Sequence, residues 1–506
     1  MSQAKLSEGS LLHRSFSALG WNYLGTVVRT ASQFILGILL ARLLGPEPFG
    51  LVAIAWLILG LGNLVGDFGL ASALVQQQAI TNRDVRYVFT MQMLAGGVMA
   101  VLIVIAAPWI AVFFKSSSAT PVIQAMGSLF LIQAAGQTAT SLLRRHLDFK
   151  RLQTYSIGSY LFGYLFVGLP LALAGAGVWA LVVAQVVQAM MYSIVVNLYV
   201  RHSWMPTLKA DAKGMFAFGS KILASNLTSW GISNLDSVII GRVFGPISLG
   251  LYNRGMNLVA SPMNAFTSTL QGVLFPAYSR TNGNAEGTRS AYLASVGLIA
   301  AIMLPAFAAV AAMPHTVIEA VYGEKWLQVV VLITPLALAM PVNAILAMGG
   351  PLMTGLGAAG TDAVSQAICV LILVPAVWLA SQVSLEAVAW TILGVYLLRA
   401  VLVSYLALRL VSGTWIQMLN ALAGPVFLGV LAALIAGLVD TVLSGIVSSP
   451  MLRLSLGLGT AGSATVFLLL WQGRHLLCSE TRSVVMKMAT RFPKPLAARV
   501  TSWGGA

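Results

Sequence analysis

Three basic residues lie inside stretches that are otherwise apolar: Arg29, Lys221 and Arg254. A charge near the centre of a membrane-crossing helix costs about 2.5 to 3.5 kcal/mol on insertion scales, so such residues usually have a functional role. Ion pairing with Asp67 and Asp236 could match at most two of these three cations, which leaves an excess of positive charge. The excess positive charge favours an anionic ligand.

Uncharged polar residues share helical faces with these cations. In the first apolar stretch they alternate with Arg29 at spacings of four, three and four residues, which places them on one face. Polar residues recur 200 positions later and again after Arg254. The candidate cavity-lining residues are Asn22, Thr26, Gln33, Asn226, Ser229, Ser233, Asn257, Ser261 and Asn264. Shorter stripes come from Asn63 with Asp67, from Gln133 with Gln137 and Ser141, and from Gln185 with Gln188 and Tyr192.

The simpler interpretation of such side chains is hydrogen bonding between helices, which contributes about 0.6 kcal/mol each on average. We prefer it for isolated Ser, Thr and Gln residues. Asp67 and Asp236 could couple transport to protons or sodium by changing charge state, or could simply pair with a nearby cation.

No residue pattern predicts catalysis. The five histidines are scattered without the spacing of metal ligands, and no ATP-hydrolysing motif is present. We therefore predict that the protein is not an enzyme, has no metal site and no cofactor, and uses at most a proton or sodium gradient.

The elements that carry these residues are apolar runs. Of 506 residues, 58% are hydrophobic and only 8% are charged, against about a quarter charged in soluble domains. Runs near 20 residues suffice to cross a bilayer as helices. They predict an all-α membrane protein with fourteen helices near 18–44, 49–75, 88–114, 120–143, 156–177, 178–200, 215–243, 249–278, 291–313, 326–354, 362–381, 384–410, 418–447 and 452–473.

The net charge of +15 follows membrane topology rather than nucleic-acid binding. Most Lys and Arg residues fall in loops on one side of the predicted helices, which is the side that stays cytoplasmic. Both chain termini are then expected to be cytoplasmic.

An internal repeat organises the chain. The segment at 41–51 returns at 241–251 with identities at Arg42, Gly45, Pro46, Gly50 and Leu51. The copies are six predicted helices apart, and an even offset preserves orientation, so the halves should be parallel repeats. A tight Gly-Pro hairpin is the simpler interpretation of each copy alone.

These segments resemble a known family. Gly20-Trp21-Asn22, the motif at 41–50, the segment Asp67-Phe68-Gly69-Leu70 and the later segments 236–242 and 250–254 are similar to bacterial polysaccharide transporters of the oligosaccharide flippase group, including lipopolysaccharide and colanic-acid exporters. The resemblance covers about the first 280 residues well.

The resemblance implies two six-helix lobes, at 1–206 and 207–412, around a central cavity that opens alternately to each side. An additional helix pair at 413–473 and a basic cytoplasmic tail at 474–506 would follow. It further implies a bacterial inner-membrane flippase whose substrate is an oligosaccharide on a polyprenyl diphosphate, with membrane lipids and other polysaccharide assembly proteins as partners. Arg29, Lys221 and Arg254 would then bind the diphosphate.

Two other functions fit the sequence less well. A cation-coupled exporter of small molecules should have a smaller, more aromatic cavity. A membrane glycosyltransferase or polymerase usually needs large extracytoplasmic loops with acidic or histidine groups, and the apolar runs leave only short loops there.

Overall fold

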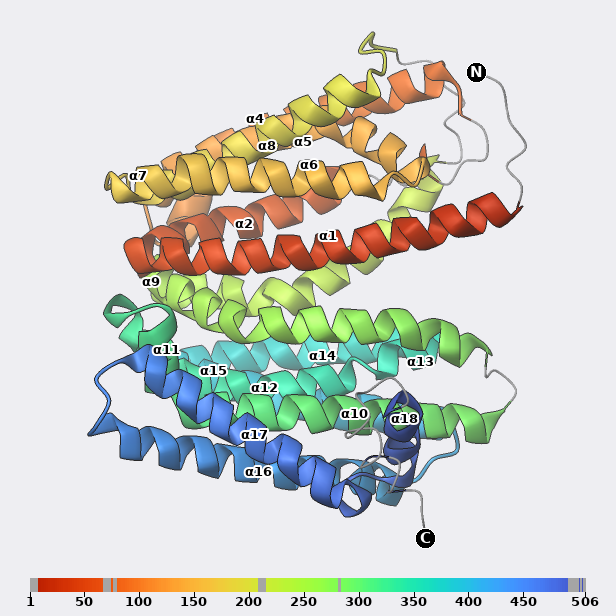
Figure 1. Ribbon diagram of the computed structural model, residues 1–506. Coiled ribbons are helices and arrows are strands. Elements are labelled where there is room, and N and C mark those ends of the chain that lie inside the picture. The colour runs from red at the N-terminus through yellow and green to blue at the C-terminus, as the bar shows by residue number, and fades with distance from the viewer. Residues whose placement is uncertain are drawn as a thin grey trace. The chain divides into compact units, whose positions relative to one another are not determined.

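The computed structural model describes residues 8–66, 74–75, 80–207, 215–280, 284–489, 500 and 503 (Figure 1). Every regular element among these residues is a helix. Thirteen of the described helices are long and apolar enough to cross a membrane. One of them, Ser229–Gly272, is interrupted by non-helical backbone at Gly245, and its 44 residues are long enough for two crossings. The prediction of an all-α membrane protein with about fourteen spans is confirmed.

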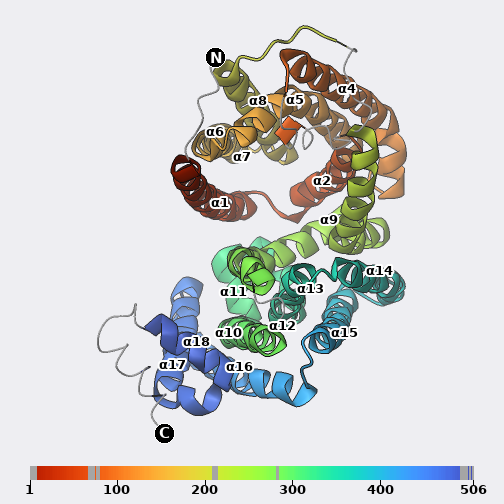
Figure 2. The ribbon, with the colours of Figure 1, turned by 90° about the vertical axis from the view of Figure 1, so that its right-hand side faces the viewer.

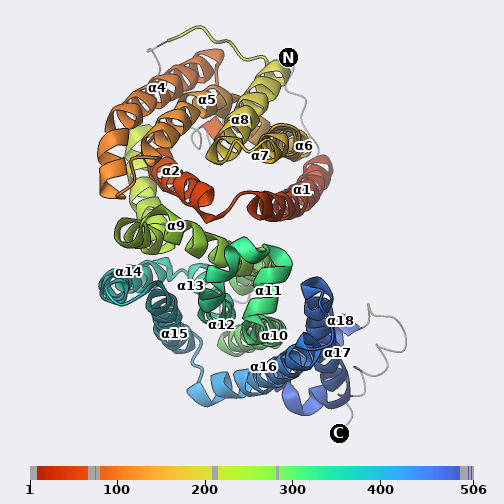
Figure 3. The ribbon, with the colours of Figure 1, turned by 90° about the vertical axis from the view of Figure 1, so that its left-hand side faces the viewer.

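Contacts divide the chain into two units, Met1–Gly250 and Leu251–Ala506. In the first unit α4 packs on α5, α5 on α8, and α1 on α6, and Figures 2 and 3 show these helices nearly end-on. Its elements are α1 (Glu8–Leu43), α2 (Pro46–Gly66), α4 (Asn82–Phe113), α5 (Ala119–Arg145), α6 (Phe149–Leu161), the π-helix Phe162–Gly168, α7 (Leu169–Leu173), α8 (Val178–Val200) and the first part of α9 (Met215–Arg280).

The second unit is built on α10 (Ala285–Ala312), which packs against α12, α16 and α18. Figure 1 shows α16 and α17 side by side, as their contacts require. The remaining elements are α11 (Pro314–Val321), the 3-10 helix Glu324–Val329, α12 (Val330–Leu346), α13 (Gly349–Gly355), α14 (Ala359–Ser381), α15 (Leu385–Leu410), α16 (Trp415–Ser444), α17 (Pro450–Leu476) and α18 (Ser479–Ala489).

Sequence signals explain where several helices begin. Proline opens α2, α11 and α17, where its missing N–H would have had no helical acceptor. Thr81 caps α4 through a capping box with Asp84. The starts of α2 and α17 lie within a few residues of those predicted from the apolar runs, whereas α11 was not predicted.

The contacts place the first part of α9, up to Gly250, in the first unit. The sequence predicted a lobe boundary at 206/207, and that boundary stays a prediction. In the segment predicted as a basic tail, α18 packs on α10, and Thr481 is fully buried there. Val500 and Trp503 are buried with Leu477 and Ala301. This part of the tail therefore contributes to the packing of the second unit.

The two copies of the repeated motif contact each other reciprocally. A Cβ atom at Gly50 would overlap the carbonyl oxygen of Pro246, and a Cβ atom at Gly250 would overlap the carbonyl oxygen of Pro46. Only glycine permits this approach of one helix start to the other. The copies differ elsewhere: Gly245 has φ 81° and ψ −174°, whereas Gly45 has no positive φ.

An ion pair fastens α17 to α11. Arg453 Nη2 lies 3.1 Å from Glu319 Oε2, and the two side chains are only 13% and 25% exposed. His315 Nδ1 lies 3.5 Å from the same oxygen. The pair is thus partly shielded from water, and its loss leaves a carboxylate without its main partner.

We expect Arg453→Met to lower the free energy of unfolding by about 1 to 3 kcal/mol, measured as thermal or denaturant unfolding in detergent. Arg474, exposed near the other end of α17, provides the control, and Arg474→Met should change the free energy by less than about 0.5 kcal/mol. Equal losses in both variants would mean that the ion pair contributes nothing specific.

Candidate functional site

The predicted polar stripe of α1 is largely exposed on the first unit. Thr26, Arg29 and Gln33 are exposed, whereas Asn22 is half-buried. Asn22 Oδ1 accepts a hydrogen bond of 2.8 Å from Gln153 Nε2 on α6, and Thr26 Oγ1 donates to the Asn22 carbonyl. Asn22 therefore joins two helices, as the simpler interpretation of polar residues expects, while Arg29 and Gln33 remain accessible.

The matching stripe of α9 is also accessible where it is described. Ser229 and Ser233 are exposed, and Ser233 Oγ donates to the Ser229 carbonyl at 3.0 Å. Asp236 is buried, 8% exposed, and accepts a 2.6 Å hydrogen bond from the Ser237 backbone N–H. The side chains of Lys221 and Asn226 lie outside the described residues, as does Asp67.

The third stripe lies in the second unit. Asn257 and Asn264 are exposed, and Arg254 and Ser261 are half-buried. Asn257 Nδ2 donates to the Asn253 carbonyl at 2.8 Å. Arg29 and Lys221 thus belong to the first unit and Arg254 to the second. The convergence of all three cations on one ligand stays a prediction.

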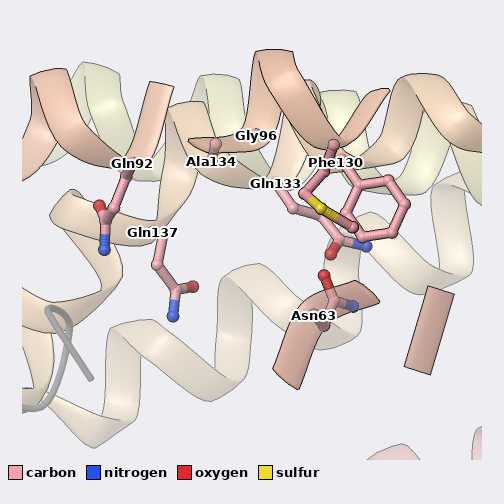
Figure 4. Close-up of a pocket in the computed structure, with 8 residues that line it drawn as sticks. Asn63, Gln92, Gly96, Phe130, Gln133, Ala134 and Gln137 are labelled. Carbon is pink, nitrogen blue, oxygen red and sulfur yellow. The ribbon is translucent and has the colours of Figure 1, made fainter. Parts of the chain in front are cut away.

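A pocket inside the first unit gathers four amide side chains from three helices (Figure 4). It encloses about 320 Å³. Asn63 comes from α2, Gln92 from α4, and Gln133 and Gln137 from α5; in Figure 4 the amides of Asn63 and Gln133 point toward each other. The pocket is lined by Asn63, Gln92, Gly96, Met99, Phe130, Gln133, Ala134 and Gln137. We call this the amide pocket.

Gln92 is the buried polar residue of the amide pocket. Its side chain is 4% exposed, and its Oε1 accepts a hydrogen bond of 2.5 Å from Thr138 Oγ1. Its Nε2 has no hydrogen-bond partner among the described residues. A buried amide N–H without an acceptor lowers the stability of a protein by about 1 to 3 kcal/mol.

Close packing of α4 and α5 holds this arrangement. A Cβ atom at Gly96 would lie 2.6 Å from Ala134 Cβ and 2.7 Å from the Phe130 carbonyl oxygen. Gln133 and Gln137 are four residues apart and share a face of α5. Their amides and that of Gln92 therefore border one space.

The chemistry of the amide pocket is neutral. None of its eight lining residues is charged. Each amide can both donate and accept hydrogen bonds, which matches hydroxyl groups better than it matches an anion. Among the described residues, no three His, Cys, Asp or Glu side chains gather as metal ligands.

Sequence reasoning identified Asn63, Gln133 and Gln137 as polar residues on helices but missed Gln92. Gln92 stands between apolar neighbours without a second polar residue on its own helical face. Its partners lie on other helices, so spacing within one helix carries no signal for it.

Comparison with known proteins gives a consistent result. The family described as "Polysaccharide biosynthesis protein" matches residues 39–331. The teichuronic acid biosynthesis protein TuaB of Bacillus subtilis (strain 168) is 24% identical over 353 residues, covering 69% of this chain and 73% of TuaB. The lipopolysaccharide biosynthesis protein WzxC of Escherichia coli (strain K12) is 22% identical, covering 68% of this chain and 70% of WzxC.

Among solved structures, the lipid II flippase MurJ in an inward closed conformation is similar in fold. The TM-score is 0.69 at 12% sequence identity, and the match covers 88% of this chain and 98% of MurJ. The fold likeness therefore extends over nearly the whole chain, including spans beyond the family match.

Proposed function

The chain belongs to the polysaccharide biosynthesis protein family, and on that basis we propose that it is a flippase for lipid-linked oligosaccharide. In this proposal it moves an oligosaccharide on a polyprenyl diphosphate from the cytoplasmic to the outer leaflet of a bacterial inner membrane. The product would enter surface polysaccharide biosynthesis. Both chain termini would be cytoplasmic, as the distribution of Lys and Arg favours.

The family match over residues 39–331 is the observation that carries the proposal. It spans the repeated motif in both copies and includes Asp236 and Arg254, whereas Arg29 precedes it. A multi-pass helical protein without a large described domain outside its spans suits transport rather than covalent chemistry.

The proposed mechanism is alternating access. Arg29, Lys221 and Arg254 bind the diphosphate, because cations recognise phosphate oxygens by charge-assisted hydrogen bonds. The polar faces of α1 and α9 solvate the sugars, and the prenyl chain stays in the lipid. Asp67 and Asp236 couple transport to a proton or sodium gradient or pair with these cations.

The first test is deletion of the gene in its native host. We expect oligosaccharide on polyprenyl diphosphate to accumulate, measured by lipid extraction and mass spectrometry, and to return to its basal level when the wild-type gene is restored. No accumulation, with surface polysaccharide unchanged, would reject the flippase and favour the small-molecule exporter. Accumulation of unpolymerised product on the outer leaflet would instead favour the polymerase.

A further inference from the structure

The amide pocket is distinct from the residues proposed to bind the diphosphate. It is formed within the first unit by α2, α4 and α5, and Arg29, Lys221 and Arg254 are not among its lining residues. Its volume of about 320 Å³ is at the lower end of the roughly 300 to 1,000 Å³ of small-ligand sites. It therefore suits a small chemical unit.

The side chains of this pocket favour a hydroxyl-rich, uncharged unit. A phosphate or an acidic sugar would need a cation, and the lining offers four amides instead. A hydroxyl group donates and accepts, as an amide does, so each can satisfy the other. Phe130 and Met99 add apolar surface for the C–H face of a sugar ring.

Gln92 has a buried amide nitrogen, Nε2, without a hydrogen-bond partner among the described residues. The residue is only 4% exposed. Buried polar groups are nearly always paired. Because this nitrogen has less than 1 Å² of accessible surface, it gains a partner in the cavity only when the Gln92 amide rotates toward it. In Figure 4 the side chains of Gln92 and Gln137 extend from α4 and α5 in the same direction.

We propose that the amide pocket binds an uncharged sugar unit of the lipid-linked substrate. This proposal rests on the flippase function proposed above. Gln133 and Gln137 donate and accept hydrogen bonds to the sugar hydroxyls, and Gln92 Nε2 joins them when its amide rotates toward the cavity. Asn63 is exposed at the edge of the pocket.

Two variants separate sugar binding from folding. Gln137→Leu removes one amide at nearly constant volume. The double variant Gln92→Leu/Thr138→Val removes a buried hydrogen-bonded pair together with the unpaired donor, and replacement of both partners by apolar groups of similar shape is close to neutral for stability. Gln124→Leu on the same helix, α5, is the control, because Gln124 does not line the pocket.

The measurement is binding in detergent to two probes: the lipid-linked oligosaccharide purified from the deletion strain, and polyprenyl diphosphate without sugar. We expect each pocket variant to bind the oligosaccharide lipid about tenfold more weakly than wild type. Binding of the sugar-free lipid should not change, Gln124→Leu should match wild type, and the double variant should unfold at or above the wild-type temperature.

Wild-type affinity of both pocket variants for the oligosaccharide lipid would overturn the inference and leave the pocket a hydrated cavity. Equal weakening for both lipids, or a lowered unfolding temperature of the double variant, would also overturn it, since either result indicates a structural role. If wild type binds neither lipid, the proposed flippase function fails, and this inference fails with it.

Discussion

Replacement of Gly50 by alanine is expected to prevent stable packing of the two repeated motifs. The new Cβ atom would overlap the carbonyl oxygen of Pro246, and a backbone atom cannot turn aside as a flexible side chain can. The helices must separate, which we expect to cost about 3 kcal/mol, the upper end of the usual range for overpacking. Most of the protein should then be lost from detergent-extracted membranes, measured by fluorescence-detected size exclusion.

Gly45→Ala is the matched control for this prediction. It lies in the same motif, has no positive φ, and a Cβ atom there would meet no heavy atom within 4 Å. It should accumulate at the wild-type level, whereas Gly250→Ala should fail as Gly50→Ala does. Normal accumulation of Gly50→Ala would show that the motifs do not need this contact.

Reversal of charge at Arg29 is expected to abolish transport with little effect on folding. Arg29 is exposed within the span Gly20–Leu43, so few protein contacts are lost. A charge-assisted hydrogen bond contributes about 1.5 to 3 kcal/mol, and repulsion of a diphosphate by glutamate adds to that loss. We therefore expect Arg29→Glu to slow flipping by about 100-fold or more in proteoliposomes.

Arg83→Glu makes the same change of charge at an exposed residue near the start of α4, and it should transport at close to the wild-type rate. Arg29→Lys should retain a large part of the activity, since it keeps the charge while losing the bidentate geometry. Transport by Arg29→Glu at the wild-type rate would remove Arg29 from the proposed diphosphate site.

Much of the fold was predictable because lipid imposes a simple length rule on apolar helices. The predicted helices near 291–313 and 384–410 lie within a few residues of α10 and α15. The rule does not detect α11 and α18, because eight and eleven residues are too short to cross a bilayer. It also treated the two Gly-Pro copies as equal, although only Gly245 adopts a positive φ.

The candidate site was predictable only in part. Spacing placed Thr26, Arg29 and Gln33 on one face of α1, and all three are exposed. The same spacing included Asn22, which also accepts a hydrogen bond from Gln153 of α6, and its place in a cavity stays a prediction. Gln92 was not predicted, because its role depends on contacts with other helices. Spacing within one helix does not encode such contacts.

The reciprocal contact at Gly50 and Gly250 means that the residue type at one position constrains the packing of the other copy. After a duplication, each copy normally accumulates changes independently of the other. Here a larger residue at either glycine would collide with the opposite copy, so neither position can accept a larger side chain unless the other copy moves. The motif can thus remain recognisable 200 residues apart while the surrounding helices diverge into separate roles.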